Sequence, residues 1–328
     1  MINLGIIGLG GITKSLHIPQ VNHSGKFYIK AAADVYTDNS VAEKFNIPDY
    51  YTDYRELLKD PSIDAVLVAT PHDLHEEHCV AAFEAGKHVI IEKPISRNLQ
   101  EAEKIIAAAQ KAGTVGMIGF CERFYDEHAY IKTLLDNKSL GRLLSARIDH
   151  YQNFNPPQNS WWRDEQSVGG GAVIGSGVHR LDLLRWYFGE AVSVYAKAVK
   201  MPRRLNAEAC VHAVIEFDSG VIADFSINWA SYNYLYCEGL SISGENGLVV
   251  TVTGLTNKLG LADVDNGMLK DFTAPRSLTM YEHFAECIET GTQPLTSLEE
   301  GYKSLQLVRA IYKSIETGTS VVPQTVTF

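Results

Sequence analysis

The sequence predicts an α/β domain with a doubly wound parallel sheet, followed by an α+β domain with a mostly antiparallel sheet. Three observations predict this arrangement. The chain has 328 residues, which exceeds the ~250–300 residues at which single cores stop growing. Short apolar runs alternate with helical patterns as far as about residue 120, and beyond it they follow one another with brief connections. We therefore expect domains at residues 1–120 and 121–328.

The first half of the chain alternates expected strands with expected helices. The strands are apolar or β-branched and end in polar or turn residues: 2–7, 27–33, 64–70, 88–92 and 115–120. The helices lie between them, at 39–46, 53–59, 73–86 and 98–112. In the last helix Asn98 and Glu101 have the spacing of a capping box, and Gly113 marks the end. Such alternation implies a parallel sheet, whose ligands bind beyond the carboxyl ends of the strands.

In the second half, the expected strands follow one another with short connections. These strands cover 143–154, 192–200, 208–217, 220–229 and 233–243. Asp218, Ser219 and Gly220 form a hairpin-like turn between two of them. Two helices are expected after the strands, at about 276–290 and 297–316. This order is typical of an α+β domain.

Composition and charge disfavour several kinds of partner. The formal net charge is −10, and without a basic cluster a nucleic-acid surface is not expected. No apolar run approaches the ~20 residues that span a bilayer, and no targeting segment is visible. The five cysteines are scattered, so we expect reduced thiols in a cytoplasmic protein. Neither they nor the histidines have the spacing of a metal site, so no metal is expected.

A dinucleotide site is predicted where the first expected strand ends. Gly8 allows the tight turn, and Gly10 lets the backbone approach a pyrophosphate at a helix N-terminus. Thr13 stands at the third glycine position of this fingerprint. Asp34 follows the second strand, where a carboxylate binds ribose hydroxyls and repels a 2′-phosphate, so NAD is favoured over NADP. The cofactor-binding residues expected here are Gly8, Gly10, Gly11, Ile12 and Asp34.

Lys93 and His179 have the chemistry that alcohol oxidation needs. Lys93 ends another expected strand of the first half, where a side chain points toward the ligand crevice. Its ammonium would stabilise the oxyanion that develops on the alcohol, and a neutral histidine would accept the hydroxyl proton. Asp182 could orient His179 or pair with Arg180 or Arg185, and an ion pair on the helix face is the preferred interpretation. Candidate aromatic residues of a sugar pocket are Tyr151, Trp161, Trp162 and Tyr232.

Several motifs follow one another in a characteristic order. They are Gly8-x-Gly10, Ala69-Thr70-Pro71-His72-x-x-His75, Ala85-Gly86-Lys87-His88-Val89, Glu92-Lys93-Pro94, Trp162-Arg163, Gly169-Gly170-Gly171 and Gly177-Val178-His179-Arg180-Leu181-Asp182. In this order the chain resembles the Gfo/Idh/MocA oxidoreductases over essentially its whole length.

The resemblance implies a Rossmann domain, a large open sheet in the second domain, and oxidation or reduction of a sugar or polyol. It also implies homodimers or homotetramers that form through that sheet. Lys93 would hold the substrate hydroxyl near the nicotinamide, and His179 would act as acid and base. The further cofactor-binding residues it implies are Thr70, Pro71, His72, His75, Glu92, Lys93 and Arg163. The substrate-binding residues expected are Lys93, Tyr151, Trp162, Gly175 and His179.

The chain departs from the family pattern at two positions. His72 stands where asparagine is frequent, and Gly175 stands where many members carry an aspartate four residues before the catalytic histidine. Residues i and i+4 share a helix face, so glycine leaves room for a larger substrate or indicates altered chemistry. The leading interpretation is an NAD-dependent dehydrogenase or reductase. The alternatives are a glycosidase that uses NAD for transient oxidation, and a non-catalytic regulator that senses dinucleotides and sugars.

Overall fold

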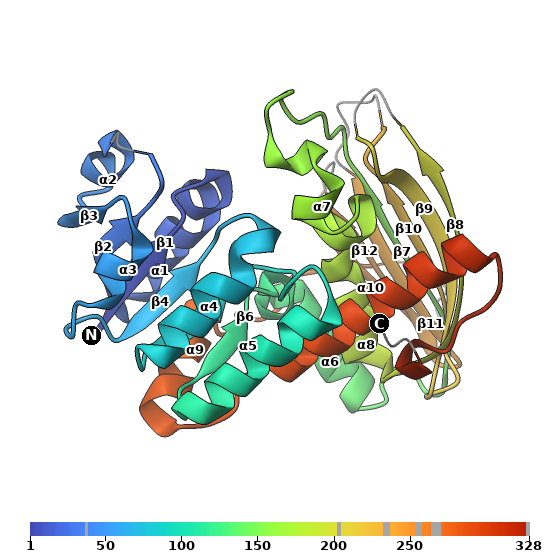
Figure 1. Cartoon of the computed structure of the whole chain (residues 1–328). Coiled ribbons are helices and arrows are strands. Elements are labelled where there is room, and N and C mark those ends of the chain that lie inside the picture. The colour runs from blue at the N-terminus through green and yellow to red at the C-terminus, as the bar shows by residue number, and fades with distance from the viewer. Residues whose placement is uncertain (37–38, 202–204, 232–236, 254–257, 264–269, 326–328) are drawn as a thin grey trace. The chain divides into compact units, whose positions relative to one another are not determined.

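The computed structural model describes residues 1–36, 39–201, 205–231, 237–253, 258–263 and 270–325. The chain divides into two compact units, whose elements are drawn in Figure 1. The first unit comprises Met1–Cys121 and Leu278–Tyr302, and the second comprises Glu122–Ser277 and Lys303–Phe328. The sequence-based division keeps residues 278–302 with the second domain, whereas the structure packs them with the first unit.

The first unit contains a six-stranded parallel sheet with the order β3-β2-β1-β4-β5-β6, which is the Rossmann order. Its strands are β1 (Ile2–Ile7), β2 (Phe27–Ala33), β3 (Asp49–Tyr51), β4 (Ala65–Val68), β5 (His88–Ile91) and β6 (Gly116–Ile118). The apolar runs of β4 and β5 are almost entirely buried, as expected for a sheet covered on both faces. The predicted doubly wound domain is confirmed. The sequence analysis missed β3, which is short and polar.

Six α-helices of the described residues belong wholly to this unit. They are α1 (Ile18–Ser24), α2 (Ser40–Lys44), α3 (Tyr54–Leu58), α4 (His75–Glu84), α5 (Leu99–Ala112) and α9 (Met280–Thr290). Helix α5 begins where Asn98 Oδ1 accepts a hydrogen bond from Glu101 N, and it ends at Gly113, whose φ is 66°. The second bond of the expected capping box goes one residue earlier, because Glu101 Oε2 accepts from Arg97 N.

The second unit contains an eight-stranded sheet in the described residues, with the order β14-β13-β12-β11-β7-β10-β9-β8. The strands are β7 (Leu143–Tyr151), β8 (Ala191–Lys200), β9 (Glu208–Phe217), β10 (Ile222–Asn228), β11 (Cys237–Gly244), β12 (Gly247–Thr253), β13 (Lys258–Asp263) and β14 (Lys270–Phe272). Only β7 and β10 are parallel among these neighbours. The predicted open, mostly antiparallel sheet is confirmed. The sequence analysis missed β12 to β14, and the candidate Tyr232 lies outside the described residues.

Helices cover one face of this sheet (Figure 1). They include α6 (Asp126–Asp136), α7 (Glu165–Val168), α8 (Val178–Phe188) and the part of α10 (Leu298–Thr317) that lies in this unit. At the start of α8, a Cβ on Gly177 would lie 2.9 Å from the Phe225 ring and 3.3 Å from Ile227, so this helix packs closely on β10. None of the described helices combines the length and the apolar character that a membrane crossing requires.

Candidate active site

The glycine loop after β1 has the geometry of a dinucleotide cradle. Gly8 has a φ of 98°, and a Cβ there would lie 2.5 Å from Ala69 O, so only glycine fits. A Cβ on Gly10 or Gly11 would meet no atom within 4 Å, so a ligand can approach the backbone closely. Thr13 is completely buried and donates a hydrogen bond to Gly8 O at 2.8 Å. Threonine at the third fingerprint position therefore stabilises the turn through a buried hydrogen bond.

Asp34 lies against this loop. Its Oδ2 accepts a hydrogen bond from Leu9 N at 2.7 Å, and its Oδ1 accepts one from Tyr36 N at 3.4 Å. The carboxylate is half-buried beside the glycine loop, and the neighbouring Ile12 is 43% exposed. The open cradle and the adjacent carboxylate fit NAD, since an anion here would repel the 2′-phosphate of NADP.

The motif histidines after β4 lie in the interior. The two ring nitrogens of His75 each lie 2.9 Å from a backbone oxygen, one from Thr70 and one from Pro94. Burial lowers the pKa of His75, which is fully buried, and His72 is only 3% exposed. His75 thus supports the chain through two backbone contacts, whereas Thr70 and Pro71 are half-buried. Binding of the cofactor by His72 and His75 stays a prediction.

Lys93 follows β5 and is half-buried, with a cis peptide bond to Pro94. The preceding Glu92 points inward. Its Oε1 accepts from His17 Nε2 at 2.7 Å, and its Oε2 accepts from Lys93 N at 3.1 Å. Burial opposes ionisation, but the His17 hydrogen bond and the nearby charges lower the pKa of Glu92 below its usual range. The carboxylate of Glu92 thus supports the backbone of Lys93, and its expected contact with the cofactor stays a prediction.

In the second unit, His179 lies in the first turn of α8 with a carboxylate nearby. Its Nδ1 is 3.9 Å from Glu122 Oε1, and the two side chains are 13% and 11% exposed. Glu122 also pairs with Arg180. Arg180 Nη2 in turn lies 2.9 Å from the Nδ1 of His150 on β7. The sequence analysis missed Glu122, because nothing local links it to a histidine 57 positions later in the sequence.

A buried carboxylate also holds the chain just before His179. Glu208 Oε1 accepts hydrogen bonds from Gly171 N at 3.1 Å, Val173 N at 3.0 Å and the Tyr312 hydroxyl at 2.8 Å. A Cβ on Gly171 would lie 2.2 Å from Glu208 O, and Gly170 has a φ of 153°. Gly171 is therefore required by close packing on Glu208, and Gly170 by its backbone conformation and the nearby Tyr312 hydroxyl.

Aromatic side chains fill the space at Gly175. A Cβ on this residue would lie 2.3 Å from Trp229 Cη2 and 3.0 Å from Trp162 Cζ3. Trp229 is 1% exposed, and its Nε1 donates to Ser176 Oγ at 3.1 Å. Trp162 packs edge-to-face on Trp229 and stacks on Trp161. The room for a larger substrate expected at Gly175 is thus occupied by indole rings.

Two predicted site residues have hydrogen-bond partners within the second unit. Tyr151 alternates with His150 on β7, so it lies on the opposite sheet face from the histidine that contacts Arg180. Its hydroxyl lies 3.0 Å from Ser226 Oγ. Arg163 donates from Nε to Pro156 O at 3.0 Å and from Nη2 to the same oxygen at 2.7 Å. Tyr151 therefore lies on the other face of β7 from His150, and Arg163 stabilises the loop around Pro156.

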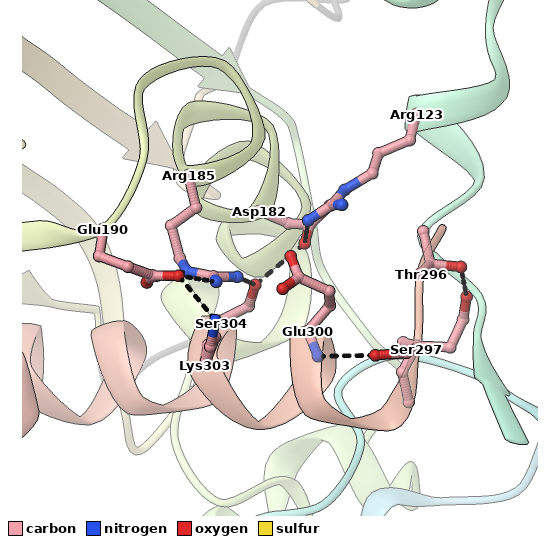
Figure 2. A network of polar contacts seen from close by, with 10 residues as sticks. Arg123, Asp182, Arg185, Glu190, Thr296, Ser297, Glu300, Lys303 and Ser304 are labelled. Atoms are coloured by element: carbon pink, nitrogen blue, oxygen red, sulfur yellow. Dashed lines mark hydrogen bonds and ion pairs between the residues drawn. The ribbon is translucent and has the colours of Figure 1, made fainter. Parts of the chain in front are cut away.

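A buried ionic network fixes the middle of α8, as Figure 2 shows. Asp182 accepts from Arg123 Nε and Nη2, both at 2.7 Å, and from Ser304 Oγ at 3.0 Å. Arg185 donates to Ser304 Oγ at 2.8 Å and pairs with Glu190 at 2.8 Å. The expected ion pair of Asp182 with Arg180 or Arg185 was wrong. Asp182 binds Arg123 and anchors the helix that carries His179.

Within the described residues, no group of three or more His, Cys, Asp and Glu side chains could hold a metal ion. The described cysteines Cys79, Cys121, Cys210 and Cys287 are free thiols.

Comparison with known proteins identifies the family. The profile described as "Oxidoreductase family, NAD-binding Rossmann fold" matches residues 2–120, and "Oxidoreductase family, C-terminal alpha/beta domain" matches residues 132–323. Myo-inositol 2-dehydrogenase of Thermotoga maritima is 29% identical over 336 aligned positions, and the alignment covers 98% of each chain. The 1,5-anhydro-D-fructose reductase of Ensifer adhaerens is 28% identical over 332 aligned positions, which again cover 98% of each chain. The structure of aldose-aldose oxidoreductase from Caulobacter crescentus, complexed with glycerol, has a TM-score of 0.90 at 25% identity and covers 98% of this chain and 99% of its own. The chain therefore belongs to the Gfo/Idh/MocA family of oxidoreductases with an NAD-binding Rossmann domain, and the resemblance of its motifs is confirmed.

Proposed function

We propose that this protein transfers a hydride between NAD and a hydroxyl-bearing carbon of a sugar or polyol, as a dehydrogenase or as the reverse reductase. One observation carries the proposal. Lys93 follows β5 at the carboxyl edge of the same parallel sheet whose β1 ends in the open glycine loop beside Asp34. Ligands of such sheets bind at that edge. The names of the relatives, an inositol dehydrogenase and an anhydrofructose reductase, support the substrate class.

In this proposal Lys93 and His179 act on one substrate hydroxyl. The Lys93 ammonium donates a hydrogen bond to the oxygen and stabilises the negative charge that develops there. Neutral His179 accepts the hydroxyl proton during oxidation and returns it during reduction. Glu122, 3.9 Å from His179 Nδ1, stabilises the imidazolium that forms. The nicotinamide of bound NAD supplies the acceptor for the hydride. Trp162, packed beside Gly175, offers an aromatic surface to the substrate.

The proposal extends to assembly and location. We propose a cytoplasmic homodimer or homotetramer that forms through the sheet of the second unit. Three apolar side chains on neighbouring strands of this sheet support it: Tyr195, Val214 and Ile222 are 40%, 48% and 51% exposed. Tyr195 and Val214 are direct cross-strand partners. Apolar side chains gathered on one exposed face often belong to an interface.

Two alternatives lose support from the comparisons. A glycosidase that oxidises its substrate only transiently would need tightly held NAD that never exchanges, and a sensor would need no acid and base. The full-length relatives carry dehydrogenase and reductase names, which favours net oxidation or reduction.

The test is an absorbance assay at 340 nm with NAD and a panel of sugars, inositols and sugar acids. We expect turnover with at least one of them, and loss of that turnover in Lys93→Ala while the variant still binds NAD by calorimetry. NAD binding without turnover on any compound would favour the sensor or the glycosidase. Full turnover in Lys93→Ala would refute the role of this lysine.

A further inference from the structure

A buried chain of hydrogen bonds runs from helix α9 to Lys93 within the first unit. The Tyr281 hydroxyl lies 2.8 Å from His17 Nδ1, and His17 Nε2 lies 2.7 Å from Glu92 Oε1. Glu92 Oε2 then accepts from Lys93 N at 3.1 Å. Tyr281 and His17 are 0% exposed, and Glu92 is 8% exposed. Such buried polar groups are destabilising unless each is hydrogen-bonded, and here one chain satisfies them all.

The chemistry of the side chains fixes where the protons lie. Burial, reinforced by the negative charge of Glu92, raises the pKa of the Tyr281 phenol well above its usual range. The phenol therefore keeps its proton, and its hydroxyl stays within hydrogen-bond distance of His17 Nδ1. On the other side of the ring, His17 Nε2 donates to the Glu92 carboxylate. As a result, Glu92 is an ionised carboxylate with one donor on each oxygen.

This fixed anion acts on Lys93 in two ways. Its hydrogen bond to Lys93 N holds the backbone from which the side chain projects. Its charge favours the ammonium form of the neighbouring lysine, since opposite charges stabilise each other's ionised state. The groups that face Glu92 are His17, Lys93 and His75. His75 also lies 2.9 Å from Pro94 O, so buried histidines support both sides of Lys93.

We propose that His17 and Tyr281 are positioning residues for the reaction: they hold Glu92 in place, and Glu92 in turn holds the backbone of Lys93 so that its ammonium is correctly aimed. The inference rests on the proposed role of Lys93. It also gives a function to the return of residues 278–302 to the first unit, because this segment supplies Tyr281. Neither residue would touch substrate or cofactor.

Three variants test the chain at increasing severity: Tyr281→Phe, His17→Gln and His17→Ala. Phenylalanine removes only the hydroxyl, and glutamine keeps an amide donor for Glu92. The controls are Tyr54→Phe, whose hydroxyl donates to Glu77 at 2.7 Å on the surface, and His88→Gln, whose Nδ1 accepts from Val115 N. The readouts are kcat, KM, the melting temperature and the pH midpoint of Lys93 modification in the protein without NAD. An amine-reactive reagent and mass spectrometry report this midpoint without turnover.

We expect His17→Ala to lower kcat about tenfold or more, as a small misplacement of a reacting group can do. Its Lys93 midpoint should fall, because Glu92 without the His17 donor can turn away from Lys93, and its charge then favours the ammonium less. His17→Gln should recover most of both quantities, and Tyr281→Phe should lower kcat by a few-fold with KM unchanged. Both controls should behave as the unmodified protein.

The outcomes separate this inference from the proposed function. Loss of kcat in proportion to the loss of melting temperature, with an unchanged Lys93 midpoint, would mean that the chain is structural and would overturn the inference. Normal kcat in all three variants would also overturn it, while inactive Lys93→Ala would leave the proposed function intact. A shifted midpoint together with full activity in Lys93→Ala would instead refute the role of Lys93.

Discussion

Placing a methyl group at Gly175 tests whether Trp229 occupies the position of the missing aspartate. The new Cβ would lie 2.3 Å from Trp229 Cη2 and 2.7 Å from its Cζ2, whereas carbon atoms pack at about 3.5–4.0 Å. The indole must therefore retreat by more than about 1 Å, although it is buried and hydrogen-bonded to Ser176. Overpacking of this kind costs about 1–3 kcal/mol, which outweighs the gain of up to about 1 kcal/mol when alanine replaces glycine in a helix.

A double-mutant cycle isolates this contact. Trp229→Phe removes the far end of the indole and its bond to Ser176, which we expect to cost about 1–3 kcal/mol. Gly175→Ala in the Trp229→Phe background should then be nearly neutral, so the coupling energy should reach about 1–2 kcal/mol. Scanning calorimetry of the four proteins measures it, at roughly 2–4 °C of melting temperature per kcal/mol. Additive effects, within about 0.5 kcal/mol, would refute the conclusion that Trp229 fills this site.

Three further predictions concern the other buried groups and the cofactor loop. Glu208→Gln should lower the free energy of unfolding by about 2–3 kcal/mol, since charged hydrogen bonds are lost around Gly171. Tyr312→Phe should lower it by less. Thermal melts should follow that order, and equal melting temperatures of the two variants would contradict it. Burial lowers the pKa of His128 from 6.5 to about 3, so the unfolded state binds a proton below about pH 6.5 that the folded state does not. Stability should therefore fall as the pH drops, by about 2 kcal/mol at pH 5, and an undiminished slope in His128→Asn would reject this cause. Asp34→Asn keeps an acceptor for Leu9 N but removes the negative charge. Calorimetry should therefore find weaker NAD binding and a smaller preference for NAD over NADP. An unchanged ratio of the two affinities would argue against Asp34 as the residue that discriminates between the cofactors.

Local sequence was sufficient for the parts of the fold that depend on nearby residues. The glycine loop and Asp34 were predicted because a tight turn and a strand end leave signals within a few positions. The apolar runs of β1 and β2 gave the observed bounds, since each run is mostly buried and is flanked by polar or turn residues. Strand β3 was missed because its three residues are half-buried and polar.

Contacts between distant segments could not be predicted in the same way. His17 meets Tyr281 across 264 positions and Glu92 across 75, and none of these residues carries a local mark of its partner. The amphipathic pattern of α9 predicted a helix, but the choice of the sheet that it covers depends on packing. The indole rings at Gly175 could not be foreseen for the same reason, since Trp229 comes from a different part of the chain.

The histidines show why residue type alone assigns roles poorly. Those of the Thr70-to-His75 motif were expected at the cofactor, because the resemblance to the Gfo/Idh/MocA oxidoreductases implies it. Yet His75 is fully buried between two backbone oxygens, and desolvation disfavours the charged form that proton transfer would create. His179 keeps a partly exposed ring with a carboxylate 3.9 Å away, an arrangement that can stabilise an imidazolium as it forms. Whether a histidine can transfer protons therefore depends on its accessibility and on a nearby opposite charge, not on membership of a motif. By that criterion His179 is a stronger acid–base candidate than His75.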